Sequence, residues 1–289
     1  MRMEENTLGV RDKYCEMLQN SVLFSPVYGQ AEVMDGLPFY CNGKNLLVVG
    51  YSVDNSRSRL QQRVGHVIEY AHQRWRESLQ TIQFWGPECP TDHNIPSDFI
   101  RTDERRPNHS NRDVVLLLDN VARRRVSSGR DIRRAKRNGL SVTINASKAP
   151  TLEHSRIFDG FLLTHDNIED EDMAYFRSWT KVLQDKDSLL FEVRRNNALT
   201  GFSVLSCFGS RTATYAYGFF NNSITGTSDL AHGAMIEYCL SAGFDELDLG
   251  YSIHASLLRY KRKWGTTRLI DPPWSVYWRW RGSAFARLK

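Results

Sequence analysis

The sequence has no long apolar run, and its cysteines show no pairing pattern. No window of the 289 residues approaches the composition of a membrane-spanning helix. The five cysteines are scattered, odd in number and without a CxxC spacing, which argues against a disulfide framework and against a zinc site. The mixed-charge N-terminus lacks the apolar segment of a secretory signal. We therefore expect a cytoplasmic protein with reduced thiols, without a metal ion and without a bound cofactor.

The net charge is only +5, but the basic residues are concentrated in two segments. Residues 123–137 hold eight basic residues and one acid, and residues 259–289 hold nine and one. Since these segments carry +7 and +8, the remaining chain carries −10. Two basic segments on a mildly acidic body indicate a polyanionic partner. The alternative is a solvated helix face and a basic tail.

The first part of the chain combines short strands with one long helix. Residues 46–51 are apolar without alternation, as in a strand that is covered on both faces. Apolar residues at helical spacing predict a helix over 56–78, and residues 79–86 predict the next strand. Four prolines between residues 86 and 112 predict an irregular loop.

A basic segment follows this loop. Residues 112–119 predict a buried strand, a basic helix broken near its middle covers 120–138, and residues 140–147 return as a strand. The proline-containing segment after that strand marks a boundary. We therefore expect two domains, residues 1–148 and 149–289.

The second domain is predicted to be a run of strands followed by an alternation of strands and helices. The helix after the strands begins at a cap formed by Ser228 or Asp229 and ends at Gly243. A short strand over 246–249 and a helix with the basic run RYKRK complete the order. This order is typical of an α+β fold, and the first domain shows a weaker version of it. The strands before the first helix are predicted over 188–195, 199–207 and 211–220.

Two short motifs end this alternation. The strand sequence GFDELDLG is followed by RYKRKWG, in which Tyr260-Lys261 precedes Trp264-Gly265. This order resembles the C-terminal half of the Fem-type peptidyltransferases, where a strand ends in glycine and a Tyr/Phe-Lys pair precedes an aromatic-glycine pair. Upstream, residues 124–142 are similar to the basic helix, glycine and strand that close the family's first domain.

The resemblance implies a fold and a reaction. Fem-type peptidyltransferases consist of two tandem acetyltransferase-like (GNAT) domains and transfer an amino acid from aminoacyl-tRNA to an amine. The resemblance therefore implies an α+β fold of two tandem GNAT-like domains, with mixed sheets flanked by helices. It also implies that the protein is a tRNA-dependent aminoacyltransferase. The sequence lacks the heptads of the long helical arm found in some members. This favours an amine on a soluble peptide or natural-product scaffold over a lipid-linked cell-wall precursor.

The turn before the predicted 229–243 helix argues against acyl-CoA as the donor. Acetyltransferases of this fold place a pyrophosphate on a glycine-rich turn at a helix N-terminus. Residues 222–229 contain one glycine, no basic residue and an acid at the helix start, where a carboxylate repels phosphate. An N-acyltransferase that uses acyl-CoA or a carrier-protein thioester is the first alternative. A non-catalytic RNA-binding module is the second.

Amide formation requires a stabilised tetrahedral oxyanion and an oriented amine. By motif position, the resemblance implies that Lys261 supplies the positive charge, with Tyr260 beside it; a solvated Lys261, or Lys263 in its place, are the alternatives. Asp229 either orients or deprotonates the amine or is a plain helix N-cap. No Ser-His-Asp or Cys-His order stands out, so we expect no covalent intermediate. Substrate contacts are expected from Tyr215, Tyr217, Asn221, Asp248 and His254.

A row of arginines on the basic helix predicts contact with an RNA backbone. Arg123, Arg130, Arg134 and Arg137 are separated by seven, four and three residues, which places them near one face. Phosphate contacts of this kind give affinity without sequence readout. We assign tRNA binding to this row together with Arg133 and Lys263. The aromatic tail over 274–280 is either a last strand of the sheet or a stacking surface for an unpaired CCA end.

Overall fold

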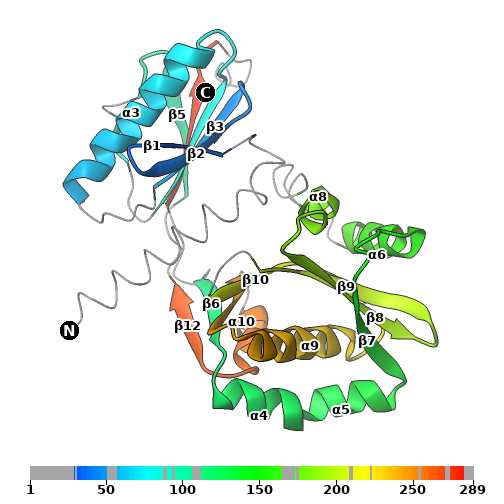
Figure 1. The fold of residues 1–289 in the computed structure, drawn as a ribbon. Helices are drawn as coiled ribbons and strands as arrows, with labels where there is room; N and C mark the ends of the chain where they lie inside the picture. Colours follow the sequence, from blue (N-terminus) through cyan, green and yellow to red (C-terminus); the bar gives the residue numbers. More distant parts are fainter. Residues whose placement is uncertain are drawn as a thin grey trace. The chain divides into compact units, whose positions relative to one another are not determined.

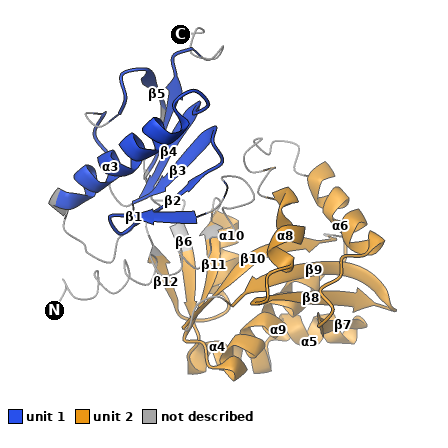
Figure 2. Cartoon of the chain, turned by 45° about the horizontal axis from the view of Figure 1, so that its top comes forward, with its two compact units in different colours: residues 1–109, 271–289 blue, residues 110–270 orange. Residues whose placement is uncertain are grey.

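The chain folds into two compact units, and one of them is formed from both ends of the sequence (Figure 2). Unit 1 comprises Met1–His109 and Asp271–Lys289, and unit 2 comprises Ser110–Ile270. The structure is a computed structural model. It describes residues 29, 31–50, 57–86, 90–92, 95–105, 112–164, 173, 176–207, 211–221, 223–252, 255–270 and 274–282.

Unit 1 is built on a six-stranded mixed sheet with the order β1-β2-β3-β4-β13-β5. Neighbouring strands are antiparallel except for β3 and β4, which are parallel and are connected through helix α3. The strands are β1 (Ala31–Met34), β2 (Leu37–Cys41), β3 (Asn45–Val49), β4 (Thr81–Gly86), β5 (Phe99–Arg105) and β13 (Trp274–Trp280).

Helix α3 (Arg57–Trp75) covers one face of this sheet (Figure 1). Its buried residues Leu60, Val64, Val67, Ile68 and Ala71 recur at helical spacing and pack against strand residues of the same core. The predicted helix and the strands on either side of it are therefore confirmed, with the helix ends inside the predicted range.

Two strands of this sheet differ from the sequence prediction. β5 lies within residues 86–112, which were predicted to be irregular, because the prolines at 96 and 107 flank the strand and do not interrupt it. The aromatic tail is a strand, which was one of its two predicted roles, but β13 lies between β4 and β5 of unit 1. Its residues Val276 and Trp278 are buried in the core, and Trp278 Nε1 donates to Asp92 Oδ1 at 2.9 Å.

Unit 2 is built on a seven-stranded sheet with the order β12-β6-β11-β10-β9-β8-β7. Only β10 and β11 are parallel neighbours among these described strands. The turn between β8 and β9 is tight, since Asn196 and Asn197 both adopt positive φ angles. The strands are β6 (Arg112–Leu117), β7 (Leu140–Asn145), β8 (Ser188–Arg195), β9 (Ala198–Ser206), β10 (Thr212–Phe220), β11 (Glu246–Ser252) and β12 (Thr267–Ile270).

Helices cover both faces of this sheet (Figure 1). On one face, α9 packs on the strands and against α4 and α5, and Leu230, Met235 and Ile236 of α9 are buried there. On the other face, α6 and α8 enclose an aromatic cluster around Phe219. The helices are α4 (Asn120–Ser128), α5 (Arg130–Arg137), α6 (Leu152–Leu163), α8 (Trp179–Leu183), α9 (Thr227–Ala242) and α10 (Ala255–Arg262).

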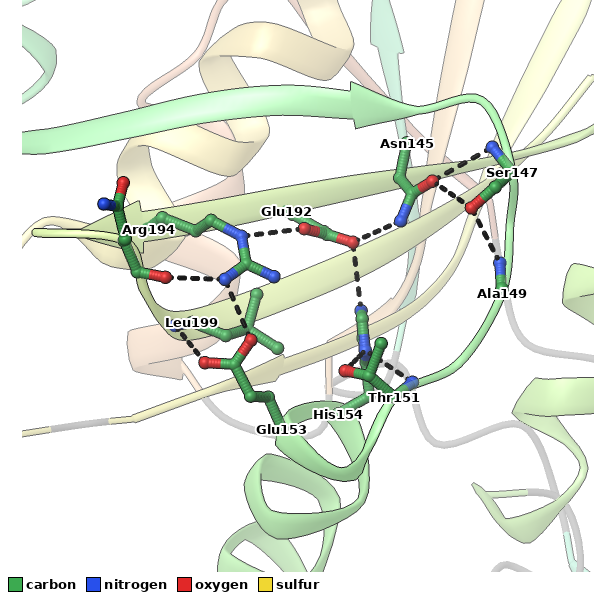
Figure 3. Close-up of polar contacts among 10 residues, drawn as sticks. Asn145, Ser147, Ala149, Thr151, Glu153, His154, Glu192, Arg194 and Leu199 are labelled. Carbon is green, nitrogen blue, oxygen red and sulfur yellow. Dashed lines mark hydrogen bonds and ion pairs between the residues drawn. The ribbon is translucent and has the colours of Figure 1, made fainter.

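A polar network joins α6 to the sheet (Figure 3). Glu192 on β8 accepts hydrogen bonds from Arg194 Nε at 2.9 Å and from Asn145 Nδ2, and His154 Nε2 lies 3.4 Å from its Oε1. Arg194 Nη1 also donates to Glu153 Oε2 at 2.9 Å. Burial lowers the pKa of His154. Because its charged groups pair with one another, this network holds α6 against the sheet.

The division between the units differs from the predicted boundary after residue 148. That boundary lies inside unit 2, where β7 pairs with β8 from Leu140↔Arg195 to Asn145↔Leu190 and so joins the two sides. The units divide before β6 and after β12, which places both basic helices in unit 2. Among the described residues, no helix combines the length and the apolar character needed to cross a membrane.

Candidate active site

The two parallel strands at the centre of unit 2 separate partway along their length. β10 and β11 pair only from Thr212↔Glu246 to Thr214↔Asp248, although β10 continues to Phe220 and β11 to Ser252. β11 was predicted to end at Gly250, which instead adopts a left-handed φ of 69° within the strand. Beyond the third pair, the described residues of β10 and β11 do not pair with each other, and the Lys261 side chain reaches a backbone carbonyl of β11 there.

Lys261 lies at this separation. It is on α10, its side chain is buried at 4% exposure, and its Nζ donates to the carbonyl oxygen of Gly250 at 2.7 Å. A buried ammonium is costly unless hydrogen bonds compensate for its lost hydration. The fold therefore holds a positive charge where β11 no longer pairs with β10, and the alternative of a solvated Lys261 is wrong.

A β-bulge separates the two tyrosines predicted to line the site. β10 shifts its register against β9 between Tyr215 and Tyr217. The ring of Tyr215 lies 4.8 Å from the His232 ring on the α9 face. Tyr217 is buried, and its hydroxyl lies 2.9 Å from Ser178 Oγ, beside α8. The structure thus brings Tyr215 to the site and places Tyr217 on the opposite face of the sheet.

Gly218 makes room for the Tyr215 ring. A Cβ atom at Gly218 would lie 1.7 Å from the hydroxyl oxygen of Tyr215. Any side chain at this position would displace the phenol from its place beside His232. Burial raises the pKa of Tyr215, so this hydroxyl stays protonated at neutral pH.

His232 and Tyr260 connect α9 to α10. His232 Nδ1 lies 2.9 Å from the Ser228 carbonyl oxygen and 3.3 Å from the Tyr260 hydroxyl. Burial lowers the pKa of His232 to about 4, and nearby Lys261 acts in the same direction. Burial and the Asp229 carboxylate raise the pKa of Tyr260. The imidazole is therefore neutral and the phenol protonated at neutral pH.

Asp229 is paired with Lys263. The residue that caps α9 is Gly226, whose φ is 95°, so the prediction that Ser228 or Asp229 forms the cap is wrong. The Asp229 carboxylate accepts a hydrogen bond from Lys263 Nζ, which also lies 3.4 Å from Asp131 Oδ2 on α5.

The Lys263 ammonium also lies over two aromatic rings. It is 4.3 Å from the Tyr260 ring centroid and 5.0 Å from that of Trp264. Such contacts favour a cation at this position. Lys263, predicted as an RNA contact, is thus tied to the α9–α10 site by two carboxylates.

The remaining predicted substrate residues do not gather at one point. Asp248 is buried, and its Oδ1 accepts from the Gly250 N–H at 2.7 Å, which stabilises the turn of β11 next to Lys261. Asn221 is exposed and accepts from the Ser223 N–H at 3.0 Å, as in a local turn. His254 lies outside the described residues.

The basic helices present their arginines to solvent. Arg123 on α4 and the predicted residues of α5 are exposed, because Ala122, Ile132 and Ala135 turn inward against the core. The predicted break is confirmed, since α4 and α5 are separated by Gly129. Arg134 also lies 3.7 Å from Asp131. The exposed α5 arginines are Arg130, Arg133, Arg134 and Arg137.

Sequence reasoning missed three residues of this site. His232 is a single histidine on a helix, Trp264 was seen only as part of the Trp-Gly motif, and Asp131 was counted as one acid among basic residues. Their aromatic and charged partners come from distant segments. In the described part of the chain, no three His, Cys, Asp or Glu side chains are grouped to hold a metal ion. A Cβ atom at Gly226 would lie 2.9 Å from Ala135 Cβ, so α5 packs directly on the start of α9.

Comparison with solved structures places this arrangement among known folds. The C-terminal domain of a putative lysylphosphatidylglycerol synthetase from Agrobacterium fabrum gives a TM-score of 0.55 at 13% identity, covering 95% of this chain and 93% of that chain. A conserved protein of unknown function from Bacteroides thetaiotaomicron gives 0.60 at 12% identity, covering 93% and 92%. FemX gives 0.52 at 14% identity, covering 92% and 94%.

These similarities establish the fold. No protein family and no curated protein matches the chain by sequence. At identities of 12–14%, the structural likeness extends to the architecture alone. Together with the two mixed sheets flanked by helices, it confirms the predicted α+β class.

Proposed function

We propose that this protein is an aminoacyltransferase that moves an amino acid from aminoacyl-tRNA to an amine. The acceptor class is a soluble peptide, a cell-wall precursor or a natural-product scaffold. The observation that carries the proposal is the buried Lys261 ammonium at the separation of β10 and β11. The fold likeness to FemX and to the synthetase domain supports this class of enzyme. The Tyr260-Lys261 and Trp264-Gly265 motif resembles that of the Fem-type family, and this resemblance implies transfer from aminoacyl-tRNA to an amine.

In this proposal, the amine nitrogen attacks the ester carbonyl carbon of the aminoacyl group. The carbonyl oxygen becomes an oxyanion, and Lys261 stabilises its charge. The intermediate then breaks the ester C–O bond, the amine nitrogen loses a proton, and the ribose oxygen of the tRNA leaves with one. Tyr260 is protonated, and its hydroxyl forms a hydrogen bond with the Asp229 carboxylate. The Asp229 carboxylate accepts a hydrogen bond from Lys263 and can accept further ones. In this way it orients the amine.

The exposed arginines of α4 and α5 form the proposed tRNA surface. They lie on the helices that pack against α9, so a bound RNA backbone would run beside the site. This surface also favours the second alternative, an RNA-binding module without activity. An acyl-CoA N-acyltransferase is disfavoured by Asp229 in the first turn of α9, where a pyrophosphate would bind.

A donor assay tests the proposal. Purified protein is incubated with charged tRNA and a mixture of amine-bearing peptides, and loss of the aminoacyl ester is followed on acid gels. We expect amine-dependent consumption of charged tRNA and no saturable binding of acetyl-CoA by calorimetry at sub-millimolar concentration. A micromolar dissociation constant for acetyl-CoA would support the N-acyltransferase. Tight RNA binding without consumption of any donor would support the RNA-binding module.

A further inference from the structure

His232 occupies the centre of the α9–α10 contact. Its ring is buried and lies 4.8 Å from the Tyr215 ring, 5.3 Å from the Tyr260 ring and 6.1 Å from the Trp264 ring. The Trp264 ring is nearly parallel to it, at 9°. Three aromatic side chains from β10, α10 and the segment after α10 thus fix the plane of the imidazole.

One hydrogen bond fixes the tautomer of this imidazole. Nδ1 lies 2.9 Å from the Ser228 carbonyl oxygen, and a carbonyl can only accept. Nδ1 therefore carries the proton. Because burial keeps the ring neutral at pH 7, Nε2 then carries none.

The same Nδ1–H reaches Tyr260. The Tyr260 hydroxyl oxygen lies 3.3 Å from Nδ1, so Nδ1–H is shared between two acceptors. The shorter hydrogen bond goes to the Ser228 carbonyl oxygen and the longer, weaker one to the Tyr260 hydroxyl oxygen. A hydroxyl that accepts from Nδ1–H cannot donate to the same nitrogen. Its own proton is therefore directed away from the imidazole and toward the Asp229 carboxylate, with which the hydroxyl forms a hydrogen bond.

We infer that His232 is a positioning residue, which fixes the Tyr260 hydroxyl so that its proton faces the Asp229 carboxylate, the group proposed to orient the amine. This inference rests on the proposed function. His232 itself is poorly suited to act as a base, because Nδ1 is already protonated and bonded to Ser228. Its contribution is orientation: the Tyr260 hydroxyl is held toward the Asp229 carboxylate before the substrate arrives, so the group that orients the amine is already in place.

Two substitutions separate this role from simple packing. His232→Asn keeps an N–H donor near the position of Nδ1, whereas His232→Phe keeps the ring and removes the donor. In single-turnover transfer from preformed aminoacyl-tRNA, we expect His232→Phe to lower kcat by about tenfold, with KM for the tRNA little changed. His232→Asn should recover most of that loss.

A double-mutant cycle with Tyr260→Phe tests whether His232 acts through Tyr260. In the Tyr260→Phe background, the hydroxyl is gone, so His232→Phe should cost little further rate. Losses that multiply in the double variant would overturn the inference. So would a His232→Asn enzyme as slow as His232→Phe.

A measurement without turnover keeps the inference testable if the proposed reaction fails. Nitrogen-15 NMR of labelled histidine, with the signal of His232 assigned by its loss in His232→Asn, reports which ring nitrogen is protonated. We expect protonation at Nδ1 at pH 7 and a shift of that signal in Tyr260→Phe. Protonation at Nε2, or no response to Tyr260→Phe, would overturn the inference whatever the donor assay gives.

Discussion

Each unit contains a β–α–β crossover between two parallel strands. We call the crossover closed in unit 1, where the strands stay paired, and open in unit 2, where they separate. In unit 1, β3 and β4 pair without interruption from Asn45↔Thr81 to Val49↔Trp85, and the Gly50 N–H then donates to the Trp85 carbonyl at 2.8 Å. In unit 2, the equivalent β10 and β11 separate after Thr214↔Asp248. The two crossovers share topology and differ in whether the strands stay paired.

The side chains at the two crossovers also differ. In unit 1, Phe84 fills the space, since a Cβ atom at Gly50 or Gly86 would lie 2.3 or 2.5 Å from its ring. In unit 2, the open crossover is lined by buried His232, Lys261 and their partners. Among the described residues, every buried Ser, Thr, His, Asp, Glu or Lys belongs to unit 2. A single topology thus serves as an apolar core in one unit and as a polar site in the other.

The sharpest test of this contrast is Lys261→Met. The substitution keeps most of the stem and removes the charge that would act only in the transition state. We expect kcat to fall by roughly 100- to 1000-fold, about 3–4 kcal/mol, with KM for both substrates little changed. Single-turnover rates with preformed aminoacyl-tRNA separate the chemical step from product release.

Two matched variants accompany this experiment. Lys263→Met should cost less rate than Lys261→Met, because Lys263 is tied to Asp131 and Asp229 beside the site. Phe84→Leu, at the equivalent place in unit 1, should lower the free energy of unfolding and leave the transfer rate of folded protein unchanged. Equal losses for the two lysine variants would remove any special role of Lys261. A rate loss with Phe84→Leu would break the contrast between the crossovers.

Acid should destabilise the open crossover more than the closed one. His232 has a folded pKa of about 4, against roughly 6.5 for an unfolded histidine. Between these pH values, only the unfolded state binds the proton. The free energy of unfolding of this region therefore falls as the pH falls, by roughly 3 kcal/mol in total. His154 contributes with the same sign, because burial lowers its pKa also.

Hydrogen exchange of separate peptides measures this effect. We expect protection of α9 to fall steeply between about pH 6.5 and 4. Protection of α3 should change less, since the described residues of unit 1 include no buried histidine. His232→Phe should flatten the α9 response. Parallel profiles for α3 and α9 would contradict the expected difference.

The smallest expected effect concerns RNA binding. Reversal of Arg130, Arg134 and Arg137 to Glu removes three candidate phosphate contacts from unit 2. We expect the affinity for charged tRNA to fall on the order of tenfold to a hundredfold, and the slope of log affinity against log salt to decrease by about 2–3. Filter-binding titrations at several salt concentrations give both quantities.

A charge-matched control lies in unit 1. Lys44, Arg76 and Arg281 are also exposed, and their reversal to Glu changes the net charge equally. This triple variant should bind tRNA with nearly unchanged salt dependence. An unchanged affinity after the α5 reversal, or an equal loss in the unit 1 control, would reject the assignment of α4 and α5 as the RNA surface.

Local features of the fold follow directly from the sequence. The helical spacing of Leu60 and Val64 identifies α3, Gly129 marks the break between α4 and α5, and the motif position of Lys261 coincides with the separation of the strands. Each of these signals depends on residues within a few turns of one another.

Non-local features could not be predicted in the same way. An ideal strand places Tyr215 and Tyr217 on one face, and the bulge that separates them arises from pairing with β9. Lys263 pairs with Asp131, 132 residues earlier in the chain. The neutral state of His232 results from burial by rings from other elements. These outcomes depend on tertiary contacts, which periodicity and motif spacing do not encode.

The position of β13 imposes an order on how the chain can acquire its structure during synthesis. Unit 2 is continuous, so all its strands are available once Ile270 has left the ribosome. The unit 1 sheet is incomplete at that moment, because β13 lies between β4 and β5 and pairs with both. The outer edge of β4 and one edge of β5 therefore lack their partner strand until β13 is made, while unit 2 can already fold.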